Sequence, residues 1–346
     1  MAALQPVAVG FPPEPLEIPP IIHEARYRSN EHLFLMRDGG EATSAYSRID
    51  KPSIACSHER GSVLFCHLWS RQSSAVPFEI SKEIMVVKKL LRTKLDKAIA
   101  AGTTQENSYT EIAYMQQCGD DTHIGTIHEA LMDRKYLFII MPWLGWDLSS
   151  TQIHDPKRLA RAMMQDLIHL QRHSILHRDV SPENIIFSSI NSSTPLIDLA
   201  MTLKCCVLEG NSQNIAAGQP WCGKLPYISP EVLAQEEFDF AADVWSMGVT
   251  LLTLVLQERF WESPSPTDLM YSFFILNQGL TDHNVLDRTI EALISQNEPP
   301  PYLGKLLKVR DMDPLLRDLL GLILSPVPND RPCVNEILNH PWFLNN

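Results

Sequence analysis

The pattern of apolar and polar residues changes once along the chain, near residue 142. Before that point, short apolar runs are separated by polar breaks, as is typical of short strands. The runs that predict strands are Ser62–Leu68, Ile84–Val87 and Tyr136–Met141. Residues 107–117 have helical spacing instead. This part of the chain is therefore expected to form a small sheet with one main helix.

After residue 142, apolar residues recur at helical spacing. Those of Pro156–Arg172 lie three or four residues apart, which places them on one helix face: Leu159, Met163, Leu167 and Leu170. Ala241–Leu256 is apolar nearly all round, as expected of a buried central helix. Further helices, bounded by Pro, Asn, Asp or Gly, are predicted at Thr267–Gln278, Pro314–Leu324 and Cys333–Asn339.

These two patterns predict an α+β fold with two lobes. The expected parts are an N-terminal extension at 1–45, a small lobe with an antiparallel sheet at 46–142, and a larger helical lobe at 143–346. Six prolines fall within residues 6–20, so we expect the extension to be largely flexible. A chain of 346 residues is long enough for two packed lobes.

Composition narrows the function classes. Hydrophobic residues make up 45% and charged residues 20%, which is typical of a soluble globular protein. The net charge of −12 argues against nucleic acid as a partner, because neutralising phosphates requires clustered Lys and Arg. No apolar stretch approaches the roughly 20 residues that cross a bilayer, so no membrane partner is expected. Seven cysteines without CxxC spacing indicate reduced thiols and a cytoplasmic or nuclear location inside the cell.

The most informative segment is His177–Asn184, which reads His-Arg-Asp-Val-Ser-Pro-Glu-Asn. Its Asp179 and Asn184 are five residues apart on a predicted loop, so both side chains are able to reach one metal–phosphate site. The segment resembles the HRDxxxxN catalytic loop of protein kinases. Taken alone, a His-Arg-Asp tripeptide is also compatible with a solvated polar turn, so the interpretation depends on companion motifs.

Three companion motifs follow in the family's order. Ile197–Ala200 occupies the place of the DFG motif, whose Asp holds magnesium. Pro226–Glu231 resembles the segment that ends in APE, and Asp243–Gly248 resembles the DxWSxG opening of the central helix of the large lobe. In the family, the Glu of APE forms a buried ion pair, for which Arg331 is the expected partner. The resemblance spans residues 46–343.

Met85–Lys88 resembles the VAIK strand of the small lobe. The resemblance implies that Lys88 holds the α- and β-phosphates of ATP. Lys89 is expected to point to the opposite face of the strand. Glu111 is the candidate partner of Lys88. The alternative is that Glu111 is a solvent-exposed helix residue without this role.

The resemblance also implies further nucleotide contacts. Gly61 and Val63 align with the end of the glycine-rich loop, GxGxxGxV, and Val63 would border the nucleotide. Cys56 and His58 stand where the first two glycines of that loop belong. Nucleotide affinity or loop mobility is therefore expected to be reduced, since glycines there let the backbone approach phosphates closely.

The run from 137 to 148 resembles the last strand and the hinge of the small lobe. Ile140 then aligns with the gatekeeper residue behind the nucleotide. Met141 and Trp143 would contact the adenine, Trp143 through backbone groups. Asp147 is a further candidate nucleotide-binding residue, and with Glu183 it occupies a position that contacts substrate arginines in basophilic relatives.

Taken together, the resemblance implies a protein serine/threonine kinase that transfers the γ-phosphate of ATP to a protein hydroxyl with Mg²⁺. Asp179 would accept or orient the hydroxyl proton, while Asn184 and Asp198 would hold Mg²⁺. The form of the catalytic loop favours Ser and Thr over Tyr as acceptors. The expected partner is a protein substrate, and the carboxylates of Asp147 and Glu183 favour basic residues before its acceptor.

Two departures from the family concern the catalytic loop. Ser181 stands where serine/threonine kinases carry a Lys that touches the γ-phosphate, and Lys224 stands where they carry a Thr. One hypothesis is that Lys224 supplies the missing catalytic charge; independent drift of an exposed Lys is the other.

The main rival to an active enzyme is a pseudokinase that acts as a scaffold or allosteric partner, and a small-molecule kinase is a third hypothesis.

Overall fold

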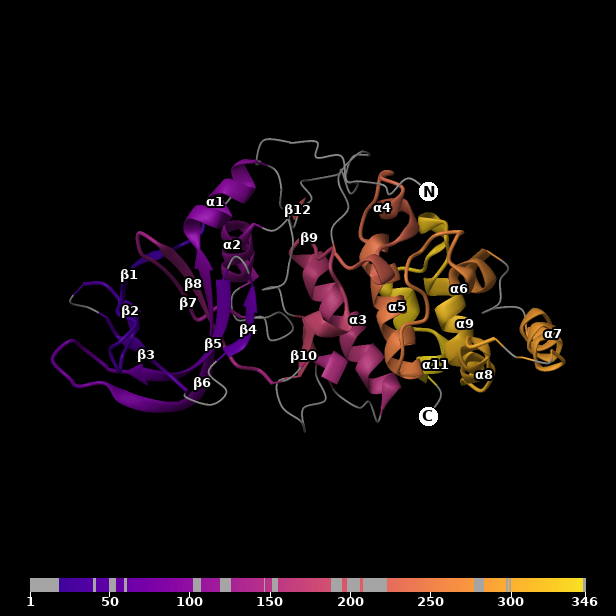
Figure 1. Ribbon diagram of the computed structural model, residues 1–346, viewed down its shortest axis with the longest axis horizontal. Coiled ribbons are helices and arrows are strands. Elements are labelled where there is room, and N and C mark those ends of the chain that lie inside the picture. Colours follow the sequence, from indigo (N-terminus) through magenta and orange to yellow (C-terminus); the bar gives the residue numbers. More distant parts are fainter. Residues whose placement is uncertain are drawn as a thin grey trace. The chain divides into compact units, whose positions relative to one another are not determined.

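The computed structural model describes residues 19–39, 42–49, 54–58, 61–101, 107–118, 126–145, 147–150, 155–187, 195–197, 206–207, 223–276, 283–296, 298 and 300–344. The chain consists of two compact units, Met1–Leu144 and Gly145–Asn346. Strands dominate the first unit and helices dominate the second (Figure 1).

An eight-stranded sheet forms the body of the first unit, counted over its described residues. Its order is β3-β2-β1-β7-β8-β6-β5-β4, and β3 also pairs with β5. The pairing of β1 with β7 is parallel, and the others are antiparallel. The strands are β1 (His23–Tyr27), β2 (Leu35–Arg37), β3 (Ser44–Arg48), β4 (Ile54–His58), β5 (Gly61–Ser70), β6 (Glu79–Leu91), β7 (Glu129–Met132) and β8 (Tyr136–Pro142).

The two faces of this sheet carry separate apolar clusters, because successive residues of a strand point to opposite sides. One cluster gathers buried side chains such as Tyr46, Val87 and Ile140. The other contains Ile139 together with residues of helices α1 (Arg92–Ala100) and α2 (Ser108–Cys118). The helices therefore cover the face of the sheet that carries Ile139.

The first unit differs from the sequence-based expectation in three respects. Strands β1 and β2 lie within the segment expected to be a flexible extension, and β1 pairs with β7, about a hundred residues later, which no local pattern reveals. That pairing is parallel, so the sheet is not wholly antiparallel. Helix α1 is present in addition to α2, the one helix that was predicted. The sequence did not reveal α1 because Leu95 is its one buried residue, which leaves almost no helical apolar pattern.

Helices α3 (Pro156–Arg172) and α5 (Ala241–Leu256) form the core of the second unit. The carboxylate of Asp155 accepts a hydrogen bond from the Arg158 N–H and caps α3 just before Pro156, the first residue of the helix. The predicted apolar face of α3 is buried, and α5 is buried on nearly every side, as predicted. Helix α9 (Pro314–Ile323) packs against α5.

The remaining elements of the second unit are short. The helix predicted from residue 267 consists of α6 and a π-helical turn, Ser272–Leu276, and α7 and α8 were not predicted. The further helices are α4 (Pro230–Leu233), α6 (Leu269–Tyr271), α7 (His283–Ile294), α8 (Leu303–Arg310), α10 (Val334–Leu338) and α11 (Pro341–Leu344). Two small antiparallel pairs join β9 (Ile175–Leu176) to β12 (Cys206–Val207) and β10 (Ile185–Phe187) to β11 (Pro195–Ile197).

The predicted ion pair between Glu231 and Arg331 is formed inside the second unit. Each terminal nitrogen of Arg331 lies 2.7 Å from one carboxylate oxygen of Glu231, and the two side chains are 0% and 3% exposed. Arg331 also donates to the carbonyl oxygens of Ala241, at the start of α5, and of Ser325. One buried guanidinium thus joins α4, α5 and the chain that follows α9.

No helix among the described residues combines the length and the apolar character needed to cross a membrane.

Candidate functional site

Lys88 and Glu111 form a close ion pair within the first unit. Lys88 Nζ, on β6, lies 3.0 and 2.9 Å from the two carboxylate oxygens of Glu111, on α2. Glu111 is buried. The side chain of Asn107 accepts the Tyr109 N–H at the start of α2 and fixes the turn that carries Glu111. The expected partner of Lys88 is therefore in place, and a charge-assisted pair of this kind holds the ammonium in one position.

Strand register places the other predicted nucleotide-binding residues of the sheet on the same face as Lys88. Val63 lies directly opposite Lys88 on one side, and Ile139 lies opposite it on the other. Gly61 lies two residues before Val63 on β5, and Met141 lies two residues after Ile139 on β8, so both share this face. Lys89 points to the other face, as predicted, where its ammonium donates to the hydroxyl of Tyr27 at 2.8 Å.

The one glycine that remains from the glycine-rich pattern has a packing reason of its own. A Cβ at Gly61 would lie 2.2 Å from the backbone oxygen of Lys89 on the neighbouring strand β6. His58 pairs with Gly61, and β4 and β5 form an antiparallel pair. Residues 59 and 60 lie outside the described residues, and nothing is described of the β4 side chains. Close strand packing alone therefore accounts for glycine at position 61.

Two hinge expectations differ from the structure. Ile140 lies on the sheet face opposite Lys88, in the cluster with Val87, so it does not border the Lys88 side of the sheet. The residues of β8 on that side are Ile139 and Met141. The backbone N–H of Trp143, expected to contact adenine, donates to the carbonyl oxygen of Ile84 at 2.8 Å. This N–H is already used by the sheet.

In the second unit, a buried carboxylate holds the backbone of the segment His177–Asn184. The two oxygens of Asp243, in the first turn of α5, accept the N–H of His177 at 2.7 Å and of Arg178 at 2.9 Å. Burial raises the pKa of Asp243 to about 6, and the hydrogen bonds from the two backbone N–H groups oppose that rise. Arg178 has a φ of 67°, so the chain turns sharply just before Asp179.

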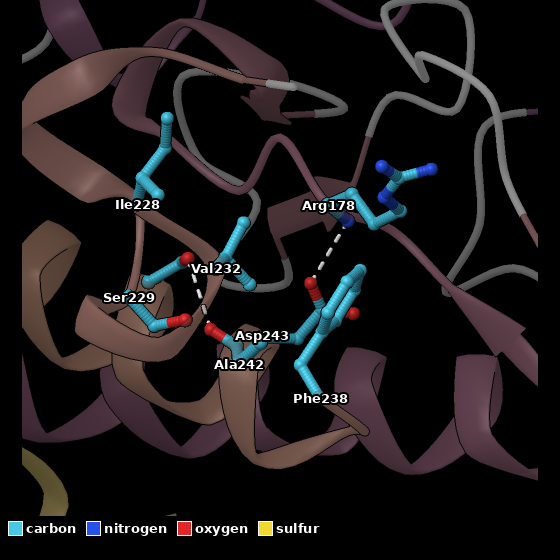
Figure 2. Close-up of a pocket in the computed structure, with 8 residues that line it drawn as sticks. Arg178, Ile228, Ser229, Val232, Phe238, Ala242 and Asp243 are labelled. Atoms are coloured by element: carbon cyan, nitrogen blue, oxygen red, sulfur yellow. Dashed lines mark hydrogen bonds between the residues drawn. The ribbon is translucent and has the colours of Figure 1, made fainter. Parts of the chain in front are cut away.

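A small pocket lies beside this anchor, and Figure 2 shows Arg178 hydrogen-bonded through its backbone to Asp243. The Arg178 guanidinium lies 5.6 Å from the ring centre of Phe238. The pocket is lined by Arg178, Ile228, Ser229, Val232, Phe238, Ala242, Asp243 and Ser246. The segment His177–Asn184, α4 and α5 therefore meet at this pocket.

Asp179 and Asn184 come together as the sequence predicted. The amide nitrogen of Asn184 donates to the carbonyl oxygen of Asp179 at 2.6 Å and to its Oδ2 at 2.8 Å. Both side chains are buried. Burial raises the pKa of Asp179, and the Lys224 charge and the Asn184 hydrogen bond oppose that rise.

One of the two expected magnesium ligands, Asn184, has an oxygen that fits a metal ion. Both amide hydrogens of Asn184 face Asp179, and its Oδ1 is buried without a hydrogen-bond partner among the described residues. An amide oxygen beside a carboxylate is the kind of ligand set that Mg²⁺ takes in proteins. The described residues contain no cluster of three or more His, Cys, Asp and Glu side chains that could hold a metal. Asp198, the other expected ligand, lies outside them.

Lys224 contacts the segment His177–Asn184 directly. Its ammonium donates to Ser181 Oγ at 2.6 Å and lies 3.8 Å from Asp179 Oδ1 and 3.6 Å from Glu183 Oε2. Gly223, just before it, has a φ of 92°, and a Cβ there would lie 2.5 Å from the Arg178 carbonyl oxygen. Only glycine fits this approach without strain. Sequence reasoning singled out Lys224 but missed Gly223 and the contacts of Asp243.

Asp147 has a structural role of its own. Its Oδ1 accepts the Ser149 N–H at 3.0 Å and so caps the 3-10 helix Leu148–Ser150. Its backbone bridges to Ile186, next to the segment that carries Asn184. One oxygen of this expected ligand-binding carboxylate is thus used within the fold.

Comparison with known proteins identifies a family and several relatives. Residues 76–343 match the family described as the protein kinase domain. The chain is 26% identical over 273 residues to calcium-dependent protein kinase 14 of Arabidopsis thaliana, covering 76% of this chain and 45% of that protein. It is 26% identical over 272 residues to serine/threonine-protein kinase ULK3 of Homo sapiens, covering 76% and 49%. With serine/threonine-protein kinase CHK1 of Saccharomyces cerevisiae it shares 24% identity over 254 residues, covering 70% and 43%. The chain spans less than half the length of each of these relatives.

Proposed function

This chain belongs to the protein kinase family, and we propose that it is an active serine/threonine kinase that transfers the γ-phosphate of ATP to a protein hydroxyl. The observation that carries the proposal is the buried pair of Asp179 and Asn184, with one amide oxygen left for a metal ion. A pseudokinase has no need to keep this arrangement buried and hydrogen-bonded.

Asp179 is the proposed acceptor of the substrate hydroxyl proton. Its Oδ2 is fixed by Asn184, which orients the carboxylate. The raised pKa makes the carboxylate a better proton acceptor than an exposed Asp, because a general base works best when its pKa is nearer the working pH.

Lys88 is the proposed ligand of the α- and β-phosphates, and the buried carboxylate of Glu111 holds it in place. Asn184 and Asp198 are the proposed magnesium ligands. When bound, Mg²⁺ neutralises charge that develops on the phosphate oxygens. Val63 and Met141 lie on the sheet face of Lys88 and are the proposed apolar contacts of the nucleotide.

The acceptor class rests on family likeness. The relatives named above include two serine/threonine-protein kinases, which supports Ser and Thr as acceptors. The proposed partner remains a protein substrate with basic residues before the acceptor. Lys224 already lies 3.6 Å from Glu183, so we expect the preference for basic residues to be weak. ATP as substrate and the reduced thiols of Cys66 and Cys333 favour a cytoplasmic or nuclear location.

A pseudokinase is the second candidate, and two observations favour it. Gly61 is explained by strand packing without any phosphate, and the Trp143 N–H is already bonded to Ile84. Both observations weaken the expected nucleotide contacts of the first unit while leaving Lys88 and Glu111 intact.

Adjacent lysines give a matched test of the two candidates. Lys88→Met removes the proposed phosphate ligand, whereas Lys89→Met removes an ammonium from the other face of the same strand. We expect Lys88→Met to lose Mg²⁺–ATP binding in calorimetry and phosphate transfer to a Ser/Thr peptide library, and Lys89→Met to keep both. Equal nucleotide behaviour of the two variants, or no binding by the unmodified chain, would favour the pseudokinase.

A further inference from the structure

We propose that Lys224 supplies the cation that binds the transferring phosphoryl group, from the segment that precedes the 3-10 helix Leu225–Tyr227 and not from the loop of Asp179 itself. The inference rests on the proposed function. It gives the reaction a phosphate-binding residue, and it explains why Lys224 is paired with Ser181.

The ammonium of Lys224 has donors to spare. An ammonium carries three N–H donors, and Ser181 Oγ takes one of them at 2.6 Å. The carboxylate oxygens of Asp179 and Glu183 lie at 3.8 and 3.6 Å, beyond normal hydrogen-bond distance. The side chain is 33% exposed, so a ligand is able to reach it. Counted over the part of the chain that the structure describes, two donors therefore have no hydrogen-bond partner and are available to anionic oxygens beside Asp179.

The position of Lys224 is fixed by the backbone on both sides. Gly223 packs against the Arg178 carbonyl and leaves no room for a Cβ. After Lys224, the Tyr227 N–H donates to the Lys224 carbonyl oxygen at 2.9 Å and closes the 3-10 turn. A flexible surface lysine has no such framing. This argues against drift of an exposed Lys as the explanation of Lys224.

Electrostatics gives the reason for a cation here. The carboxylate of Asp179 repels the phosphate oxygens that must come close to it, and Ser181 carries no charge to offset this. A positive charge 3.8 Å from Asp179 reduces that repulsion. In the transfer step, the bond from the γ-phosphorus to the ADP oxygen breaks and a bond to the substrate oxygen forms. The hydroxyl proton passes to Asp179, and Lys224 stays protonated throughout.

A reciprocal exchange tests the proposal. The variants are Lys224→Thr, Ser181→Lys and the double variant Ser181→Lys/Lys224→Thr, with Lys82→Thr on β6 as an exposed control. Calorimetry with Mg²⁺ measures the affinities for ATP and ADP, and steady-state kinetics measures kcat. Thermal unfolding checks that each variant folds, and Lys224→Gln replaces Lys224→Thr where the latter does not.

We expect Lys224→Thr to weaken ATP binding by roughly 10-fold or more and to leave ADP binding unchanged, because only ATP has the γ-phosphate. Its kcat should fall by roughly 10²-fold, as for loss of one charge-stabilising donor. The double variant should recover both, since the lysine then projects from position 181 into the same site.

The remaining outcomes separate this inference from the proposed function. An unchanged ATP-to-ADP preference in Lys224→Thr overturns the inference, because Lys224 then does not contact the γ-phosphate. A higher kcat in Lys224→Thr also overturns it, because Lys224 then inhibits Asp179. Absence of nucleotide binding in the unmodified chain also overturns it. If the unmodified chain binds ATP in a Lys224-dependent manner but transfers no phosphate, the inference stands and the proposed function fails.

Discussion

Removing Arg331 is expected to destabilise the second unit more than any change to a surface ion pair. Its guanidinium is fully buried and makes two 2.7 Å contacts with Glu231. It also donates to two backbone carbonyl oxygens and lies 5.0 Å from the ring centre of Trp245. Arg331→Met therefore leaves a buried carboxylate without its counter-charge and two carbonyl groups without a donor.

The magnitude follows from burial. Breaking a buried pair from one side typically costs about 3–5 kcal/mol, because the remaining charge keeps its desolvation penalty. Arg259 and Glu262 provide the matched control: they lie 3.9 Å apart and are 53% and 75% exposed. Such an exposed pair is worth about 0–1 kcal/mol. Glu262→Gln should therefore be nearly silent.

Urea denaturation measures the free energies of unfolding of Arg331→Met, Glu231→Gln, the double variant and Glu262→Gln. We expect both buried single variants to lose several kcal/mol, and the double variant to lose clearly less than their sum, since it leaves no unpaired charge. If Arg331→Met matches the Glu262→Gln control, or if the two single losses simply add, the buried pair does not hold these segments as argued.

Two further predictions concern α5. Gly248→Ala should destabilise the protein by about 1–3 kcal/mol in thermal or urea unfolding, because the added Cβ would lie 2.4 Å from Ile323 Cγ2. The control is Gly304→Ala, whose added Cβ would have no atom within 4 Å and which should be neutral or slightly stabilising. Equal losses of stability in the two variants would refute the packing argument. The pKa of Asp243 is raised from 3.8 to about 6 in the folded chain, so its contribution to stability is present below pH 3.8 and is lost as the pH rises through 6. The unfolding free energy of the unmodified chain should accordingly fall relative to Asp243→Asn between pH 4 and 6, and parallel pH profiles would contradict the raised pKa.

Local chemistry could be predicted from the sequence where motif spacing fixes it. The alternation of a strand was enough to place Lys88 and Lys89 on opposite faces of β6. Glu111 followed from the helix predicted at residues 107–117, which is α2. The pairing of Glu231 with Arg331 followed from the family resemblance across a hundred residues of sequence.

Features that depend on tertiary contacts could not be predicted. A shift of one residue in the pairing of β6 with β8 would move Ile140 to the other face of the sheet, and a sequence match does not determine that register. Strand β1 is defined by its pairing with β7, and Gly223 by its contact with the Arg178 carbonyl. The hydrogen bonds that Asp243 accepts from the backbone N–H groups of His177 and Arg178 depend on how α5 packs.

Phosphate transfer by the unmodified chain and by Asp179→Asn tests the central claim most directly. The assay follows Mg²⁺-dependent transfer of the γ-phosphate from ATP to a Ser/Thr peptide library, with the exposed Asp311→Asn as control. We predict robust transfer by the unmodified chain and by the control, and a loss of roughly 10²- to 10⁴-fold in Asp179→Asn with ATP binding retained. Equal transfer by Asp179→Asn, or none by a folded unmodified chain, would contradict the account.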